Sequence, residues 1–180
     1  MQFKFTWIIC IFANCLLIYL TQLVNHSLGA IALPLFTLGL TLIFPVLYLP
    51  YLQGLIATLI TALFFDSTEA ISSFGYSYYI LGIAFTTVYC VYHHFKLYSP
   101  LHTILLIQFT NLSLLITYHL ILNFENGFNP HFFHKLFQVV IASKIILLLI
   151  STWFLNLQAT LFHTFSFHHP STKKQPHSPK

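Results

Sequence analysis

The charged residues of this chain are few, and almost all of them lie at the edges of long apolar runs. The 180 residues include seven Lys and three Asp or Glu, no Arg, and 57% hydrophobic side chains. Soluble proteins carry about a quarter charged residues, so a chain with 6% charged side chains cannot cover a soluble surface. We therefore expect the apolar runs to face lipid, and the charges to mark where the chain leaves it.

Six apolar runs are candidates for membrane-spanning helices. A span needs roughly 20 mainly apolar residues, so 180 residues hold six or seven spans and no soluble domain. The predicted fold is all-α, a polytopic membrane helical bundle over residues 1–162, followed by a polar, proline-rich cytoplasmic tail over 163–180 that favours disorder. The first run is longer than the core of a signal peptide, which favours a retained helix. The predicted spans cover residues 5–24, 28–49, 51–65, 76–92, 101–122 and 136–162.

The boundary between the second and third spans depends on two prolines. Pro45 and Pro50 cannot both sit comfortably inside one helix, and Tyr48 and Tyr51 suit the headgroup level of a bilayer. A tight turn here gives six spans, whereas a re-entrant segment would give five. We predict the tight turn.

Lysine placement predicts that both termini are cytoplasmic. This orientation puts five lysines inside and one outside, as the positive-inside rule requires. The cytoplasmic group is Lys4, Lys96, Lys173, Lys174 and Lys180, and the external group is Asp66, Glu69, Glu125 and Lys135.

Asp66 and Lys144 do not simply follow this topology. Asp66 ends the third span, where with Glu69 it would bind a cation or relay protons; the reading we favour is that Asp66 caps the next segment at the water boundary. Lys144 lies inside the sixth span, so its side chain must snorkel or pair with an acid. Helical side chains lean toward the helix N-terminus, which directs Lys144 toward the level of Asp66. We predict a structural ion pair between them, with snorkelling of Lys144 as the alternative.

The third span carries small residues at four-residue spacing, namely Gly54, Thr58 and Ala62. Small side chains at this interval let two membrane helices approach closely. The pattern predicts a packing face, either within the bundle, which we favour, or toward a partner.

The fifth span carries a partly polar stripe that includes Gln108, Asn111 and His119. Polar groups in lipid must find hydrogen-bond partners, so this stripe points inward. It would serve either as interhelical glue, which we favour, or as the wall of a small-molecule pocket.

We expect no catalytic, metal or cofactor site. Cys10, Cys15 and Cys90 lie inside apolar runs without CxxC spacing, and no cysteine or carboxylate stands beside the histidine pairs His93–His94 and His131–His134. The sequence has no GxSxG, HExxH or P-loop motif. The small, dispersed positive charge also argues against nucleic-acid binding.

The segment GLIATLITALFFDSTEAISSFGYSYYILGIAFTTVYCVYHHFK resembles the bacterial rod-shape-determining MreD family. In that family a Gly-rich apolar span ends in an aspartate, a short loop leads to a glycine, and the next span ends in a basic cytoplasmic loop. The matching positions here are Gly54, Asp66, Gly75 and Lys96, and Pro34 matches the proline that starts the family's second span. The chain departs from the family pattern at STEAISS, which lacks the loop glycine, and at HHFK, which lacks arginine.

The resemblance implies a non-catalytic scaffold of the wall-elongation machinery in the bacterial cytoplasmic (inner) membrane. Its partners would be an MreC-like bitopic protein, the MreB filament, the glycosyltransferase RodA and its transpeptidase. The alternative is a substrate-binding subunit similar to the S components of energy-coupling-factor (vitamin-type) transporters. That function needs a polar pocket, for which the stripe of Gln108, Asn111 and His119 together with the loop after Asp66 is the candidate.

Overall fold

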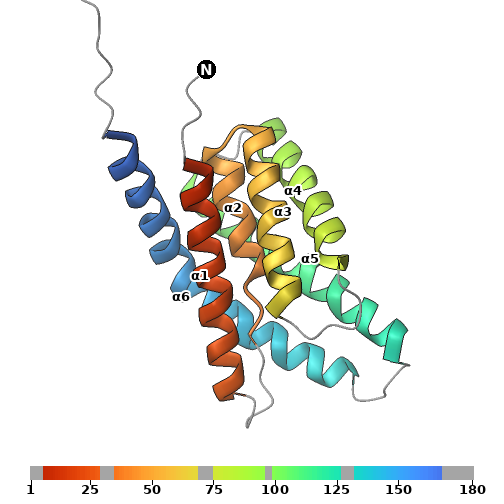
Figure 1. The fold of residues 1–180 in the computed structure, drawn as a ribbon. Helices are drawn as coiled ribbons and strands as arrows, with labels where there is room; N and C mark the ends of the chain where they lie inside the picture. The colour runs from red at the N-terminus through yellow and green to blue at the C-terminus, as the bar shows by residue number, and fades with distance from the viewer. Residues whose placement is uncertain (1–5, 29–34, 69–74, 96–98, 127–131, 168–180) are drawn as a thin grey trace, which may run out of the picture.

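The computed structural model describes residues 6–28, 35–68, 75–95, 99–126 and 132–167. These residues form six α-helices: α1 (Thr6–Leu28), α2 (Leu38–Tyr48), α3 (Tyr51–Thr68), α4 (Tyr76–Phe95), α5 (Pro100–Asn126) and α6 (Phe132–Phe167). Successive helices run in alternating directions, so that α1 begins and α6 ends at the same end of the bundle (Figure 1). The all-α fold is as predicted.

Four of the described helices are long and apolar enough to cross a membrane by length and composition. They are α1, α3, the part Leu101–Ile121 of α5 and the part Leu136–Leu161 of α6. The outer faces of the bundle carry large exposed apolar side chains, such as Phe12, Phe109 and Leu149, each more than 70% exposed. A soluble monomer rarely exposes apolar surface on this scale, whereas lipid covers it. This is the architecture of a multi-pass helical membrane protein.

The prediction of a continuous second span over residues 28–49 needs correction. Helix α2 has 11 residues, which is about 16 Å at 1.5 Å per residue, only half of the roughly 30 Å hydrocarbon layer. Of the predicted span 28–49, Leu28 belongs to α1 and residues 35–37 are not helical, while residues 29–34 lie outside the described part. Helix α4 (Tyr76–Phe95) has 20 residues and covers the predicted fourth span 76–92, although it is not among the four helices that qualify by length and composition.

The end of α6 also differs from the prediction. The helix continues to Phe167, beyond the predicted end of the sixth span at residue 162. Residues 168–180 of the predicted tail lie outside the described residues.

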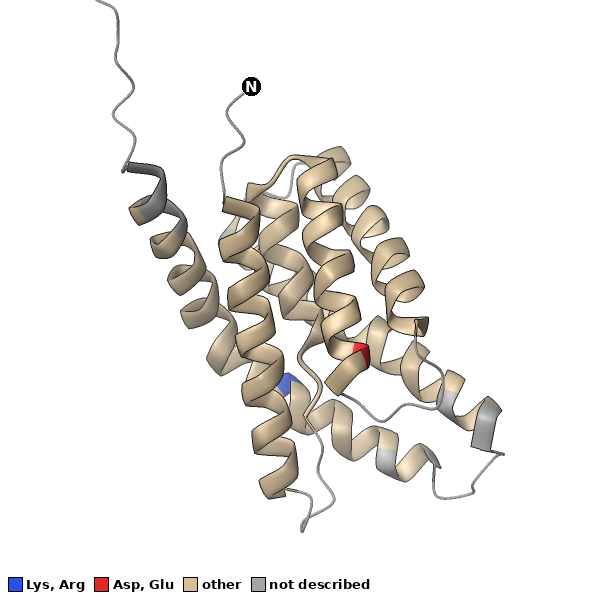
Figure 2. Ribbon diagram, in the orientation of Figure 1, with Lys and Arg blue, Asp and Glu red and all other residues tan. Residues whose placement is uncertain are grey.

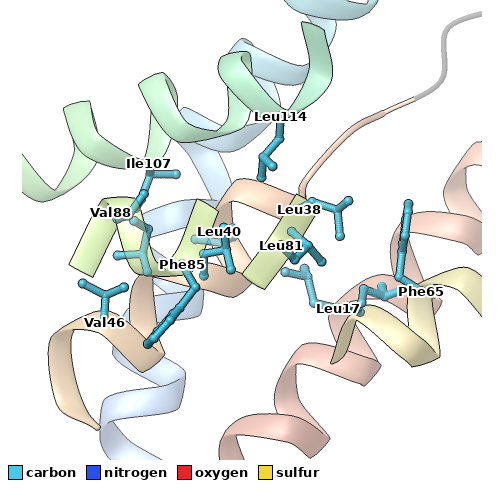
Figure 3. Packing of buried hydrophobic residues seen from close by; sticks show 14 of the residues in the cluster. Leu17, Leu38, Leu40, Val46, Phe65, Leu81, Phe85, Val88, Ile107 and Leu114 are labelled. Atoms are coloured by element: carbon cyan, nitrogen blue, oxygen red, sulfur yellow. The ribbon is translucent and has the colours of Figure 1, made fainter. Parts of the chain in front are cut away.

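The short helix α2 is the centre of the bundle. It contacts each of the other five helices, and every residue from Leu38 to Val46 is buried. Its apolar side chains join those of the surrounding helices in one cluster, in which Leu40 and Val46 pack with Phe85 and Ile107 (Figure 3). A helix that is apolar all round must be buried on all sides. The longer helices therefore lie around α2, between it and the lipid.

The tight turn between α2 and α3 is confirmed. Leu49 is extended (φ −106°, ψ 146°), because the ring of Pro50 disfavours a helical conformation in the residue before it. Helix α3 begins directly afterwards at Tyr51, and the N–H of Gly54 donates to the carbonyl of Pro50 at 2.9 Å. Pro50 thus ends one helix and starts the next.

Candidate functional site

A buried amide pair compensates for the proline inside α2. Pro45 has no N–H, so the carbonyl of Thr41, four residues earlier, lacks its helical donor. The Asn14 side chain of α1 donates Nδ2–H to this carbonyl at 2.9 Å. Gln158 of α6 in turn donates Nε2–H to Oδ1 of Asn14 at 3.0 Å. Asn14 and Gln158 are both at most 1% exposed, so the pair is sealed inside the bundle.

The non-helical residues before α2 are held by side chains from three other helices. Asn25 of α1 accepts from the N–H of Leu35 at 2.6 Å and donates to its carbonyl at 2.9 Å. Ser143 of α6 accepts from the N–H of Phe36 at 3.0 Å. Asn111 of α5 accepts from the N–H of Gly39 and donates to the carbonyl of Phe36, both at 2.9 Å.

These contacts form one polar girdle around α2, which we define as Asn14, Asn25, Asn111, Ser143 and Gln158. Unpaired backbone groups cost several kcal/mol each in lipid, so irregular backbone at membrane depth must be satisfied by protein. Each girdle residue is paired with α2, with the segment before it, or with another girdle residue. The chemistry of the girdle is therefore structural: it fixes a broken helix at the centre of the bundle.

The predicted stripe on α5 separates in the structure. Asn111 is a girdle residue and is buried. Gln108 makes only a long contact, from Nε2 to the carbonyl of Lys144 at 3.5 Å, and His119 is half-buried further along α5. Cavities of about 360 Å³ between α4 and α5 and about 340 Å³ near Tyr48 are lined by other residues. The three stripe residues therefore do not share a pocket in either place.

The small-residue face of α3 lies inside the bundle. Thr58 and Ala62 are at most 1% exposed. A Cβ added at Gly54 would lie 2.7 Å from the ring of Phe85 in α4 and 3.2 Å from the carbonyl oxygen of Pro45 in α2. Gly54 thus allows α2, α3 and α4 to approach one another closely.

Asp66 and Gly75 meet where α3 ends and α4 begins. The N–H of Gly75 donates to Oδ2 of Asp66 at 3.0 Å, and Gly75 has a φ of +106°, a region that favours glycine. The buried carboxylate therefore lies at the N-terminal end of α4, where the helix dipole favours a negative charge. This is the geometry expected of a residue that caps the next segment.

The predicted ion pair between Asp66 and Lys144 is not seen. Among the described residues, Asp66 is the acidic side chain and Lys144 is the basic one (Figure 2). Asp66 bonds to Gly75 instead, and Lys144 is exposed on α6. The prediction used the depth of the two residues along the bundle axis. That depth does not determine which side of α6 the Lys144 side chain faces. Glu69 lies outside the described residues.

Sequence reasoning missed four of the five girdle residues: Asn14, Asn25, Ser143 and Gln158. A usable signal was present, because amides inside apolar runs must find partners in lipid and Pro45 leaves a carbonyl in need of a donor. What the sequence lacks is the pairing itself, since Gln158 and Asn14 are 144 residues apart.

Within the described ranges, no three His, Cys, Asp or Glu side chains come together as metal ligands would. Cys10, Cys15 and Cys90 are free thiols. Comparison with family models, with curated proteins and with solved structures finds no match to this chain.

Proposed function

We propose that this chain is a non-catalytic membrane scaffold of the bacterial cell-wall elongation machinery. It would reside in the cytoplasmic membrane with both termini inside. Its partners would be an MreC-like bitopic protein, the MreB filament, RodA and the transpeptidase. The proposal starts from the resemblance of residues 54–96 to the MreD family.

The observation that carries the proposal is the contact between Asp66 and Gly75. These are the two residues of the resembling segment that flank its loop, and the N–H of Gly75 donates to the Asp66 carboxylate at 3.0 Å. The contact gives a physical reason for an aspartate and a glycine at these positions, because the acid caps the next helix and the glycine adopts a positive φ.

The distribution of polar side chains also favours a scaffold over a substrate-binding subunit. A ligand pocket needs polar groups that are free to bind a substrate. The amide of Asn111, the most buried residue of the predicted pocket, bonds to the backbone of Phe36 and Gly39. The stripe therefore supports internal packing better than ligand recognition.

The proposed orientation agrees with the arrangement of the helices. The start of α1 and the end of α6 lie at the same end of the bundle (Figure 1), as the lysine distribution requires. Asp66 and Gly75 lie at the opposite end, which would be external.

Depletion of the chain in its host bacterium tests the proposal. We expect rod-shaped cells to round up and a bitopic coiled-coil protein to copurify with the tagged chain. Replacement of Asp66 by Leu removes the acceptor for Gly75 and should fail to restore the rod shape, whereas Asp66→Asn keeps an oxygen acceptor and should restore it at least in part. Unchanged cell shape after depletion, or copurification with an ATPase module and a vitamin-sized ligand, would overturn the proposal.

A further inference from the structure

Helix α6 is longer than a membrane crossing requires. Its 36 residues measure about 54 Å at 1.5 Å per residue, whereas the hydrocarbon layer of a bilayer is roughly 30 Å thick. Residues 145–167 alone measure about 35 Å and are long enough to cross this layer. The crossing therefore does not need residues 132–143, the first part of the helix.

Lys144 lies at the junction of these two parts of α6, and its side chain is exposed. Its neighbours on the exposed face are Ile141, Ile145 and Leu148, so the ammonium group leaves the helix among side chains that face lipid. A charged side chain is costly at the centre of a bilayer, and a long lysine lowers this cost by extending its head to the headgroups. The position of Lys144 therefore indicates a membrane surface close by.

The charge of Lys144 lacks an acidic partner among the side chains that the structure describes. Asp66 is the carboxylate among them, and it bonds to Gly75 instead. Figure 2 shows Asp66 and Lys144 at a similar level along the bundle, where α3 ends. Helical side chains lean toward the helix N-terminus, which in α6 lies at this same end of the bundle (Figure 1). The ammonium group is thus directed to the headgroup layer on the Asp66 side of the membrane, where lipid phosphate is the group of opposite charge.

The exposed face of α6 also changes character at Lys144. Before it, the rings of Phe133 and Phe137 are exposed, and beside them Nε2 of Gln138 lies 3.1 Å from Nε2 of His134. After it, the next exposed side chains are all aliphatic, namely Ile145, Leu148 and Leu149. Aromatic rings beside polar groups suit a helix segment in the interface, whereas an aliphatic face suits the hydrocarbon.

We propose that the headgroup layer on the Asp66 side meets α6 at Lys144, and that the Lys144 ammonium binds the phosphate of a phospholipid there. Residues 132–143 then lie in the headgroup layer, and the sixth span begins after Lys144 rather than at residue 136. The phosphate belongs to a lipid rather than to the solution, because the exposed face on both sides of Lys144 continues the lipid-facing surface of the helix. This inference depends on the membrane architecture alone and holds for either orientation and for any function.

Cysteine reactivity in reconstituted vesicles tests where the boundary lies. The full-length chain, with its three native cysteines replaced, carries one new cysteine at Phe137 or, as a matched control on the same face, at Leu148; the two positions are 64% and 57% exposed. A maleimide reacts with the thiolate, which does not form in hydrocarbon. In vesicles of phosphatidylethanolamine and phosphatidylglycerol, we expect Phe137→Cys to react with membrane-permeant N-ethylmaleimide many-fold faster than Leu148→Cys. Equal rates at the two positions, slow or fast, would overturn the proposed boundary.

The contact with phosphate is tested with the same Phe137→Cys probe. Lys144→Leu removes the ammonium group that holds the helix at the headgroups, so the rate at position 137 should fall several-fold, whereas Lys144→Arg keeps a cation and should keep the rate. In vesicles of digalactosyldiacylglycerol, a lipid without phosphate, the chain with Lys144 should react as slowly as the Lys144→Leu variant.

The rates are compared for folded protein that elutes as one species in size-exclusion chromatography. An unchanged rate in Lys144→Leu, an equal loss in Lys144→Arg, or equal rates of the Lys144 chain in the two lipids would contradict the contact with phosphate. Cell shape is not a readout here, so this test and that of the proposed function fail independently.

Discussion

At the scale of single residues, Asn14 takes the place of a missing backbone N–H. Pro45 leaves the carbonyl of Thr41 without a helical donor, and Asn14 supplies one from a neighbouring helix. A buried polar atom that loses its partner costs about 1–3 kcal/mol. The amide of Asn14 is therefore matched to the proline rather than to a ligand.

Replacement of Asn14 by Leu should lower the free energy of unfolding by about 2 kcal/mol, because the Thr41 carbonyl and Gln158 both lose a partner. In a Pro45→Ala background the same change should cost about 1 kcal/mol, since an alanine at this position supplies the missing N–H. Unfolding titrations in mixed micelles measure both values. Asn123→Leu, which removes a bond only to the carbonyl of His119 in the same helix, is the control at about 0.5 kcal/mol. Equal costs of Asn14→Leu in the two backgrounds would contradict the match with Pro45.

At the scale of elements, α2 is held against α5 both by close backbone approach and by a side-chain amide, and both come from Asn111. The backbone of Asn111 in α5 lies so close to Gly39 that an added Cβ would be 2.6 Å from its N and Cα. The same Asn111 side chain bonds to Gly39 and Phe36. The two features depend on each other, because the amide reaches the backbone only while the helices touch.

Gly39→Ala should destabilise the protein by about 3 kcal/mol, because rigid backbone atoms of α5 must move to admit the methyl group. Gly82→Ala is the matched control, since its new methyl group meets only the flexible end of Leu59 at 3.2 Å. That variant should stay within about 1 kcal/mol of the wild type. Thermal unfolding in detergent measures both variants, and equal losses would argue against tight packing of α2 on α5.

Asn111→Leu should cost about 3 kcal/mol, because two buried backbone groups lose their partners. Gln108→Leu, one turn earlier on α5, removes only a contact of 3.5 Å and should cost less than about 1 kcal/mol. The difference is measurable by unfolding in mixed micelles. If Gln108→Leu lowers the free energy of unfolding more than Asn111→Leu does, the polar stripe does not stabilise the protein mainly by holding α2.

At the scale of the whole molecule, the charges and the direction of the helices together predict the orientation in the membrane. The helices alternate in direction (Figure 1). Once the side of one connection is assigned, the sides of all the others follow. The positive-inside rule then predicts that the connection between α4 and α5 lies on the cytoplasmic side and the end of α3 on the external side.

Single-cysteine variants test this orientation after Cys10, Cys15 and Cys90 are replaced. Ser67 at the end of α3 and Ser99 before α5 are both exposed. Ser67→Cys should react with a membrane-impermeant maleimide in intact cells, and Ser99→Cys should react only after permeabilisation. The reverse pattern would invert the topology and remove one support of the proposed function.

The limits of sequence reasoning are visible in particular residues. The turn at Pro50 was predictable because proline acts on its immediate neighbours, and the burial of Thr58 and Ala62 followed from their spacing. The ion pair of Asp66 with Lys144 was not a safe prediction, because sequence position sets the depth of a side chain in the bundle but not the direction it faces. Of the girdle around α2, only Asn111 was identified from the sequence.

By itself, the sequence determined that this chain is a bundle of membrane helices and where most of those helices lie. Apolar run length, charge placement and proline act locally, so they can be read without knowing any contact. Only the tertiary structure decided that the second run becomes a short buried helix with a non-helical entrance. Such a break in lipid is stable only when its backbone groups find partners, and here Asn111 and Ser143 lie 72 and 107 residues away from the groups they bind.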